Sequence, residues 1–361
     1  MYKEKFLALE SLRGIAAISV ALFHFNPGSH LHNAFVNNAW IMVDFFFVLS
    51  GFVIALNYLG RITTTQQLFL FQKKRFFRLY PLHIIMLFAF VAVEFAKFFV
   101  ELKFQIVANN PAFSTNNMTS FATNIFLIQN WVSEDLTFNG PSWSISAEFY
   151  TYAIFGILLV LTNGKKQILI FSLIIAILVI GSFFKVNSMT SGFLSGPLRC
   201  LYSFSLGVLG YCLFEQLRHR ILFSSSIPSM LCLILSVYVV TSISSTESPF
   251  IPLIPILFGI TILILVLTKK DQKIHKVLSK EWAVYLGTIS YGIYMIHSLI
   301  WWIIGNVLRF VFNIPSEIDA EGTTSLAINN MFIADVIMVF GLGIIIVLAH
   351  LSYKYVETRF N

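Results

Sequence analysis

Apolar runs of roughly 20 residues, the length that a helix needs to cross a bilayer, recur along this chain from one end to the other. Polar or Gly/Pro-containing breaks separate them, as expected of helices that satisfy their own backbone hydrogen bonds in lipid. Only 11% of the 361 residues are charged, against about 25% in a soluble domain. The pattern predicts an all-α integral membrane protein with a single domain over residues 1–361. About ten transmembrane helices are expected, at residues 8–26, 39–59, 80–100, 143–162, 167–184, 197–215, 227–243, 252–268, 282–304 and 331–351.

The basic residues predict how these helices are oriented. Lys and Arg concentrate in the loops that share a side with the two chain ends, and this positive-inside bias predicts that both ends are cytoplasmic. The segment 121–131 is too short for a span, and we expect it to be an interfacial piece. The net charge of +7 is explained by this topology and by contact with anionic lipid, so it does not indicate nucleic-acid binding. The outer side keeps only Lys97, Lys103, Lys185 and Arg309.

Several classes of function lack a signal in this chain. The three cysteines, Cys200, Cys212 and Cys232, fall in or beside spans without metal-ligand spacing, so we interpret them as packing residues and expect no metal site. No glycine-rich nucleotide fingerprint or hydrolase motif is present. The informative residues are therefore the ionisable ones within spans, because a charge there is costly and marks a partner or a functional cavity.

The first span carries Glu10, Arg13 and His24. His24 follows Arg13 by eleven positions, which places them on one helix face about 16 Å apart along the axis. Ala17 and Ala21 lie between them on that face and leave room for a slender ligand. The alternative is an ion pair of Glu10 with Arg13 at the inner interface and a histidine buried for packing.

Three further ionisable residues, Asp44, Glu148 and His297, are predicted to share the outer half of the membrane with His24. Asp44 could simply cap a helix. A histidine beside carboxylates suits general-base activation of a hydroxyl group.

Basic residues are predicted at the inner face. Arg75 and Arg78 lie just before Tyr80 and Pro81, on the same side as Arg13. Such a cluster suits a phosphorylated donor, although positive-inside bias alone would also explain it.

Six segments, in order, resemble the sequence blocks of the bacterial transmembrane acyltransferase-3 family. They are residues 9–17 with His24 (LESLRGIAA and an Arg-x10-His spacing), 44–52 (DFFFVLSGF), 75–81 (RFFRLYP), 142–150 (SWSISAEFY), 287–297 (GTISYGIYMIH) and 353–357 (YKYVE). Together they span nearly the whole chain. Val43 stands where the family usually has Gly, and Arg359 where Pro is common, and neither side chain is expected to react.

The resemblance implies transfer of an acyl group, usually acetyl from acetyl-CoA, to a sugar hydroxyl of a surface or exported glycan, free or lipid-linked, at the bacterial inner membrane. Combined with the predicted layout, it leads us to expect that CoA phosphates meet Arg13, Arg75 and Arg78 and that the pantetheine arm follows Ala17 and Ala21. His24 is then expected to take the acceptor proton, with Glu148 or Asp44 orienting it or stabilising the imidazolium. Substrate contacts are expected from Trp143, Tyr291, Tyr294 and His297. A covalent acyl-His intermediate stays an open variant.

Two other classes of function are compatible with ten spans and intramembrane charges. A transporter of polysaccharide precursors or small solutes would have the same appearance, but no convincing internal repeat is present. A non-catalytic membrane scaffold is the second alternative.

Overall fold

The computed structural model describes residues 6–105, 110–133, 135–184, 195–244, 248, 250–318, 324–326, 328 and 330–360. Lys185, which enters the predicted charge bias, lies outside the described residues.

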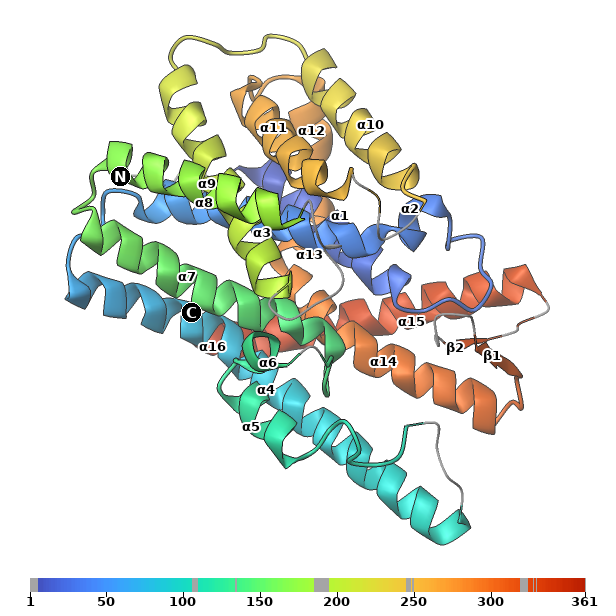
Figure 1. The fold of residues 1–361 in the computed structure, drawn as a ribbon. Helices are drawn as coiled ribbons and strands as arrows, with labels where there is room; N and C mark the ends of the chain where they lie inside the picture. Colours follow the sequence, from blue (N-terminus) through green and yellow to red (C-terminus); the bar gives the residue numbers. More distant parts are fainter. Residues whose placement is uncertain are drawn as a thin grey trace.

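The described part of the chain is almost wholly helical (Figure 1). The longer helices are α1 (Leu7–Phe23), α3 (Met42–Tyr58), α4 (Thr65–Phe104), α7 (Trp143–Leu161), α8 (Lys166–Phe184), α9 (Ser195–Leu217), α10 (Ile227–Thr241), α11 (Ile254–Leu267), α14 (Ser290–Phe310) and α15 (Met331–Ser352). The shorter ones are α2 (Ala34–Asn37), α5 (Met118–Ile125), α6 (Gln129–Val132), α12 (Lys273–Leu278), α13 (Glu281–Thr288) and α16 (Thr358–Phe360). One small antiparallel hairpin, β1 (Ser316–Ile318) with β2 (Thr324–Leu326), was not predicted.

Six helical segments of the described chain are long and apolar enough to cross a membrane, and the chain is a membrane protein. Each of the ten predicted spans overlaps a helix, but the count of ten membrane crossings stays a prediction. The segment 121–131 forms parts of the short helices α5 and α6, as expected of a piece that does not span. The six segments are Ala39–Tyr58, Thr65–Phe104, Gly140–Leu161, Ser195–Leu217, Ser290–Phe310 and Met331–Glu357.

The predicted continuous span 282–304 is wrong, because the chain breaks at Ile289 into α13 and α14. The carbonyl of Gly287 accepts hydrogen bonds from Arg13 Nη2 (2.8 Å) and from Ser290 Oγ (2.8 Å). Such side-chain donors compete with the helical backbone bond, which gives the break a physical cause. Gly287 is also in direct backbone contact with α1, since a Cβ there would lie 1.9 Å from the carbonyl oxygen of Glu10. The break therefore lies beside Arg13.

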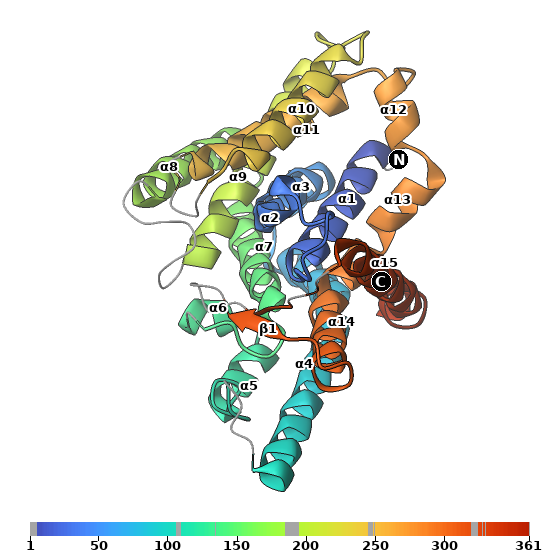
Figure 2. The ribbon, with the colours of Figure 1, turned by 90° about the vertical axis from the view of Figure 1, so that its right-hand side faces the viewer.

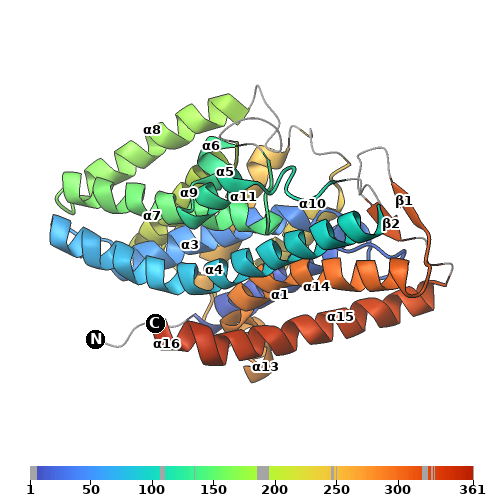
Figure 3. The ribbon, with the colours of Figure 1, turned by 90° about the horizontal axis from the view of Figure 1, so that it is seen from below.

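Helix α4 is a single helix of 40 residues that joins the predicted span 80–100 to the basic segment before it. At 1.5 Å per residue it is about 60 Å long, twice the roughly 30 Å core of a bilayer. Figure 3 shows α4 running nearly the full length of the molecule.

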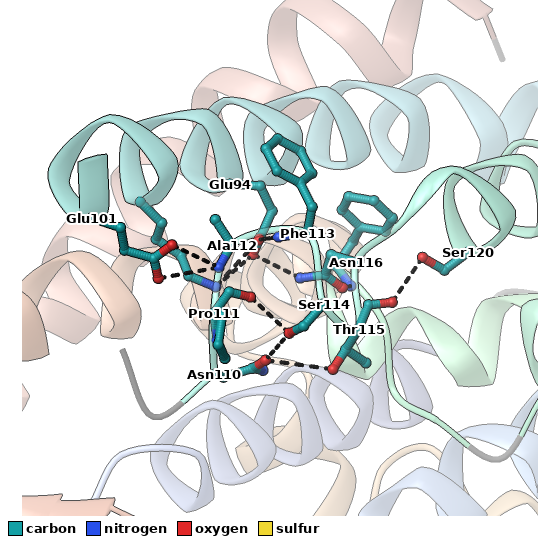
Figure 4. A network of polar contacts seen from close by, with 12 residues as sticks. Glu94, Glu101, Asn110, Pro111, Ala112, Phe113, Ser114, Thr115, Asn116 and Ser120 are labelled. Carbon is teal, nitrogen blue, oxygen red and sulfur yellow. Dashed lines mark hydrogen bonds and ion pairs between the residues drawn. The ribbon is translucent and has the colours of Figure 1, made fainter. Parts of the chain in front are cut away.

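The far end of α4 is tied to the following loop by buried Glu94 (Figure 4). Its carboxylate accepts from Lys97 Nζ (3.0 Å), from the backbone N–H of Phe113 (2.8 Å) and from Asn116 Nδ2 (2.9 Å). Glu101 binds the backbone N–H of Ala112 one step further along. These bonds satisfy a buried charge and fix the loop that leads to α5.

Helices α3 and α9 touch through their backbones at the centre of the molecule. A Cβ at Gly51 would lie 2.0 Å from the Phe204 carbonyl oxygen, and one at Gly207 would lie 1.9 Å from that of Val48. Only glycine allows this approach, which brings Asp44 of α3 and Arg199 of α9 together. Viewed along another axis, α7, α3 and α1 form the middle of the bundle, with α4 and α14 beside them (Figure 2).

The described ends of the chain lie at the same end of the molecule. Phe6 and Leu7 line the same cavity as Tyr353 and Glu357. In Figure 3 this end also holds the α3–α4 and α7–α8 connections. The arrangement agrees with termini on one side, and which side faces the cytoplasm stays a prediction.

Candidate active site

Two adjoining cavities enter the helix bundle from the end where the chain ends meet. The outer of the two, here called the vestibule, has a volume of about 410 Å³ and contains Glu10 and Glu357 in its wall. The inner one, the deep cavity, has a volume of about 110 Å³ and lies among α1, α3, α4, α7 and α14. The two share the lining residues Arg13, Leu49, Val53, Ile54, Arg75, Arg78 and Tyr291.

Arg13 is held in the shared wall by several partners. It pairs with Glu10 (3.0 Å) and donates from Nε to Ser290 Oγ (3.0 Å), besides its bond to the Gly287 carbonyl. Arg13 thus joins α1 to the break between α13 and α14. The predicted Glu10–Arg13 ion pair is confirmed.

Arg75 and Arg78 lie in the same wall and form fewer hydrogen bonds and ion pairs than Arg13 does. Arg75 donates weakly from Nη2 to Tyr58 Oη (3.5 Å), and its guanidinium lies 5.7 Å from the Tyr58 ring centroid. Its Nε is buried without a partner in the described structure. Arg78 forms no hydrogen bond or ion pair with a described residue. Two guanidinium groups with few partners therefore lie beside Arg13 in this wall.

Glu148 lies deeper, in the wall formed by α7. Tyr152 Oη donates to its Oε1 at 2.5 Å, and Ser50 Oγ donates to the same oxygen. The described contacts of His24 are instead the Val20 carbonyl and neighbouring rings. The predicted direct orientation of His24 by Glu148 is therefore not seen, because Glu148 is held on the α3–α7 side.

Tyr294 and Ser144 both line the deep cavity. Its Oη donates to the Pro141 carbonyl (2.9 Å) and bonds Ser144 Oγ (2.8 Å). The His297 ring lies directly behind, with its centroid 5.8 Å from that of Tyr294.

His24 and His297 form a pair on the far side of Tyr294, with ring centroids 4.8 Å apart. His24 donates from Nδ1 to the Val20 carbonyl (2.9 Å), and His297 from Nδ1 to that of Ile293 (3.2 Å). A carbonyl only accepts, so each neutral ring keeps a free lone pair on Nε2. His297 is fully buried and its Nε2 has no hydrogen-bond partner among the described residues, whereas His24 is exposed at the end of α1. His24 is thus the histidine able to meet a ligand from outside.

The predicted role of Asp44 in orienting His24 has no support in the described contacts, because both of its oxygens accept from other residues. Arg199 donates from Nε to Asp44 Oδ1 (3.0 Å) and from Nη2 to Oδ2 (2.7 Å), and Ser203 Oγ donates at 3.1 Å. Both charged side chains are buried. The pair fastens α3 to α9.

The aromatic residues predicted to contact the substrate have partners within the protein. Trp143 faces the Arg199 guanidinium, 5.6 Å from its ring centroid. Tyr291 donates its hydroxyl to the Leu79 carbonyl, and it lines the arginine-containing cavities with Tyr294. These tyrosines lie on the side of the arginines, and their contact with a substrate stays a prediction.

The predicted ligand path along Ala17 and Ala21 is not present. Both alanines are fully buried, and neither lines the cavities found in the described chain. Trp301 Nε1 donates to the Ala21 carbonyl at 2.7 Å, so this stripe of α1 packs against α14. The deep cavity instead follows α3 and α7.

We expect Ala21→Leu to lower stability by about 1–3 kcal/mol, because the added atoms have no space beside Trp301. Thermal unfolding of the purified protein and acyl transfer per folded molecule would be measured together. An unchanged melting temperature with lost transfer would restore the stripe as a ligand path.

Sequence reasoning missed Ser50 and Tyr152, the partners of Glu148, and did not assign a partner to Arg199. Arg199 carried a usable signal, because an arginine inside a span requires a buried partner and Asp44 is an intramembrane carboxylate. Ser50 and Tyr152 are ordinary residue types in spans, so only the fold brings them together.

The structure thus defines a membrane protein with an arginine-lined cavity that reaches Tyr294, next to a histidine pair. Residues 6–351 match the acyltransferase domain that characterises the acyltransferase-3 family, and the chain belongs to that family. It is a membrane acyltransferase, and the transporter and scaffold alternatives are dropped.

Three relatives illustrate the range of the similarity. The ORF330 protein of Acidianus two-tailed virus, which carries an acetyltransferase name, is 24% identical over 83% of this chain and 84% of its own. Peptidoglycan O-acetyltransferase OatA of Listeria monocytogenes is 26% identical over 82% of this chain and 49% of its own. Acyltransferase MdmB of Streptomyces mycarofaciens is 28% identical over 41% of this chain and 38% of its own. No solved structure matches the chain.

Proposed function

We propose that this protein transfers an acetyl group from acetyl-CoA to a sugar hydroxyl of a cell-surface or exported glycan. The proposal places it in the bacterial plasma membrane with ten spans and both ends cytoplasmic. One observation carries it: Arg13, Arg75 and Arg78, from two helices, surround a cavity that opens at the end rich in Lys and Arg. The positive-inside rule favours the cytoplasm on that side, where acetyl-CoA is available.

The donor fits the cavities by its chemistry. Its diphosphate meets Arg78 and Arg75 in the wall shared by the two cavities, where the Arg75 Nε lacks a partner. Its pantetheine arm enters the deep cavity between Phe47 and Ile145. The thioester then lies near Ser144 and Tyr294, with the histidine pair directly behind.

His24 serves as the general base in this proposal. The Nδ1–H bond to the Val20 carbonyl leaves Nε2 as the acceptor. As the sugar oxygen attacks the thioester carbonyl, its proton passes to His24 Nε2 and the CoA thiolate leaves. Displacement of Tyr294 or His297 must accompany this step, because both rings lie between the deep cavity and His24.

The acceptor approaches from the opposite side to the donor. His24 is exposed at the far end of α1, about 16 Å along the axis from Arg13. A relative named as a peptidoglycan O-acetyltransferase supports a glycan acceptor. The sugar is free or lipid-linked, and the bilayer is the only other expected partner.

The decisive experiment follows CoA-dependent acetylation of a glycan by the purified protein, comparing wild type with Arg78→Ala. We expect Arg78→Ala to raise the apparent KM for acetyl-CoA by roughly tenfold or more, because a charge-assisted phosphate contact is lost. The KM for the acceptor should change little.

Lys73→Ala is the matched control, since Lys73 is an exposed basic neighbour on α4 that lines none of the three cavities found in the described chain. An unchanged KM for acetyl-CoA in Arg78→Ala would mean that the basic cluster is only topological. Absence of transfer by wild type would remove the proposed function itself.

A further inference from the structure

A third cavity, here called the side cavity, adjoins the vestibule at the same end of the molecule. Its volume is about 270 Å³, and it lies where α3 passes into α4. It shares Asn57 and Tyr58 with the vestibule. The two cavities are therefore neighbours, and a ligand in the vestibule lies beside the side cavity.

Two cations, Arg61 and Lys74, line the side cavity, and none of the described residues in its wall is acidic. Neither side chain forms a hydrogen bond or ion pair with a described residue, and both are exposed. The vestibule differs, because Glu10 and Glu357 line it. The side cavity is thus a site for an anion, separate from the arginines around the deep cavity.

Helical geometry links this second cationic site to the first. Lys74 and Arg78 are four residues apart on α4, which puts them on one face about 6 Å apart along the axis. Phe71 lies on the same face one turn earlier and packs edge-on to Tyr58, with ring centroids 4.7 Å apart. The side cavity therefore offers two basic groups beside aromatic side chains.

We propose that the side cavity binds the 3′-phosphorylated adenosine end of the donor, with Arg61 and Lys74 on the 3′-phosphate and Tyr58 against the nucleoside. This inference rests on the proposed function. A CoA thioester carries a phosphate on its ribose, apart from its diphosphate, whereas an acyl group on a carrier protein's phosphopantetheine has no such group. Two separate cationic sites fit the first class of donor.

The test compares acetyl-CoA with acetyl-3′-dephospho-CoA as donors. Wild type should prefer acetyl-CoA by about tenfold or more in kcat/KM. The double variant Arg61→Ala/Lys74→Ala should use acetyl-CoA no better than wild type uses the dephospho donor. The kcat/KM of this variant for the dephospho donor should stay within about twofold of wild type, because that donor lacks the 3′-phosphate that Arg61 and Lys74 would bind. Lys73→Ala again serves as the control.

The outcomes separate the two proposals. Equal use of both donors by wild type, or a double variant that weakens both donors equally, would overturn the 3′-phosphate site and leave the proposed function standing. A lipid headgroup in the side cavity would also abolish the donor preference, and the variant's activity would then depend on the anionic lipid content of the vesicles. Failure of wild type to use either donor would overturn both proposals.

Discussion

His24→Ala is expected to lower acetyl transfer by about 10²- to 10⁴-fold, the usual contribution of a positioned general base. His24 is the exposed member of the histidine pair, and its Nδ1 bond to Val20 keeps Nε2 free to accept a proton. His297, the other member, is fully buried. The loss should appear in kcat, because the donor cavity lies on the other side of Tyr294.

His219→Ala provides the control, since His219 is an exposed histidine outside the cavities found in the described chain. The rates would be compared at equal amounts of folded protein in the membrane. Acetylation by His24→Ala at the level of the control would refute the role of His24 as base.

The arginine cluster shows what local sequence can predict. Arg75 and Arg78 lie three residues apart on an unbroken helix, so their shared location follows from periodicity and charge. The positive-inside bias also predicts that Arg75 and Arg78 lie on the same membrane face as Arg13. The cavities of the structure bring these arginines together.

The predicted ligand path along Ala17 and Ala21 shows what local sequence cannot predict. Small residues between Arg13 and His24 indicated space, but space depends on what a neighbouring helix fills, and Trp301 of α14 occupies the place beside Ala21. The break at Ile289 has a weak local signal in Gly287 and Gly292, which disfavour helix, but the competing donor comes from Arg13, 274 positions from Gly287. Both features are products of tertiary contact.

The predicted contacts of Asp44 and Glu148 with His24 are absent from the described structure for a related reason. Asp44 and Glu148 were assigned to His24 because all three were predicted at one depth, yet depth does not determine which face of a helix a side chain takes. Asp44 turns to Arg199 and Glu148 to Tyr152. A buried charge selects the nearest partner that can neutralise it or donate to it.

The second large effect is expected at the pair of Asp44 with Arg199, and it concerns stability. Asp44→Leu should lower the free energy of unfolding by about 3–5 kcal/mol, because it leaves the Arg199 charge buried without its partner. Chemical or thermal unfolding in detergent would measure this change.

The double variant Asp44→Leu/Arg199→Met distinguishes a structural pair from a catalytic carboxylate. Removing both charges with apolar side chains should restore most of the lost stability, since a buried ion pair costs nearly as much desolvation as it gains in attraction. Transfer per folded molecule should also return to near wild type if the pair only fastens α3 to α9, and Trp143, which faces Arg199, should lose only its cation–π contact. A double variant that is stable but inactive would restore Asp44 to the catalytic site. A double variant as unstable as Asp44→Leu alone would mean that the ion pair contributes net stability that apolar packing cannot replace.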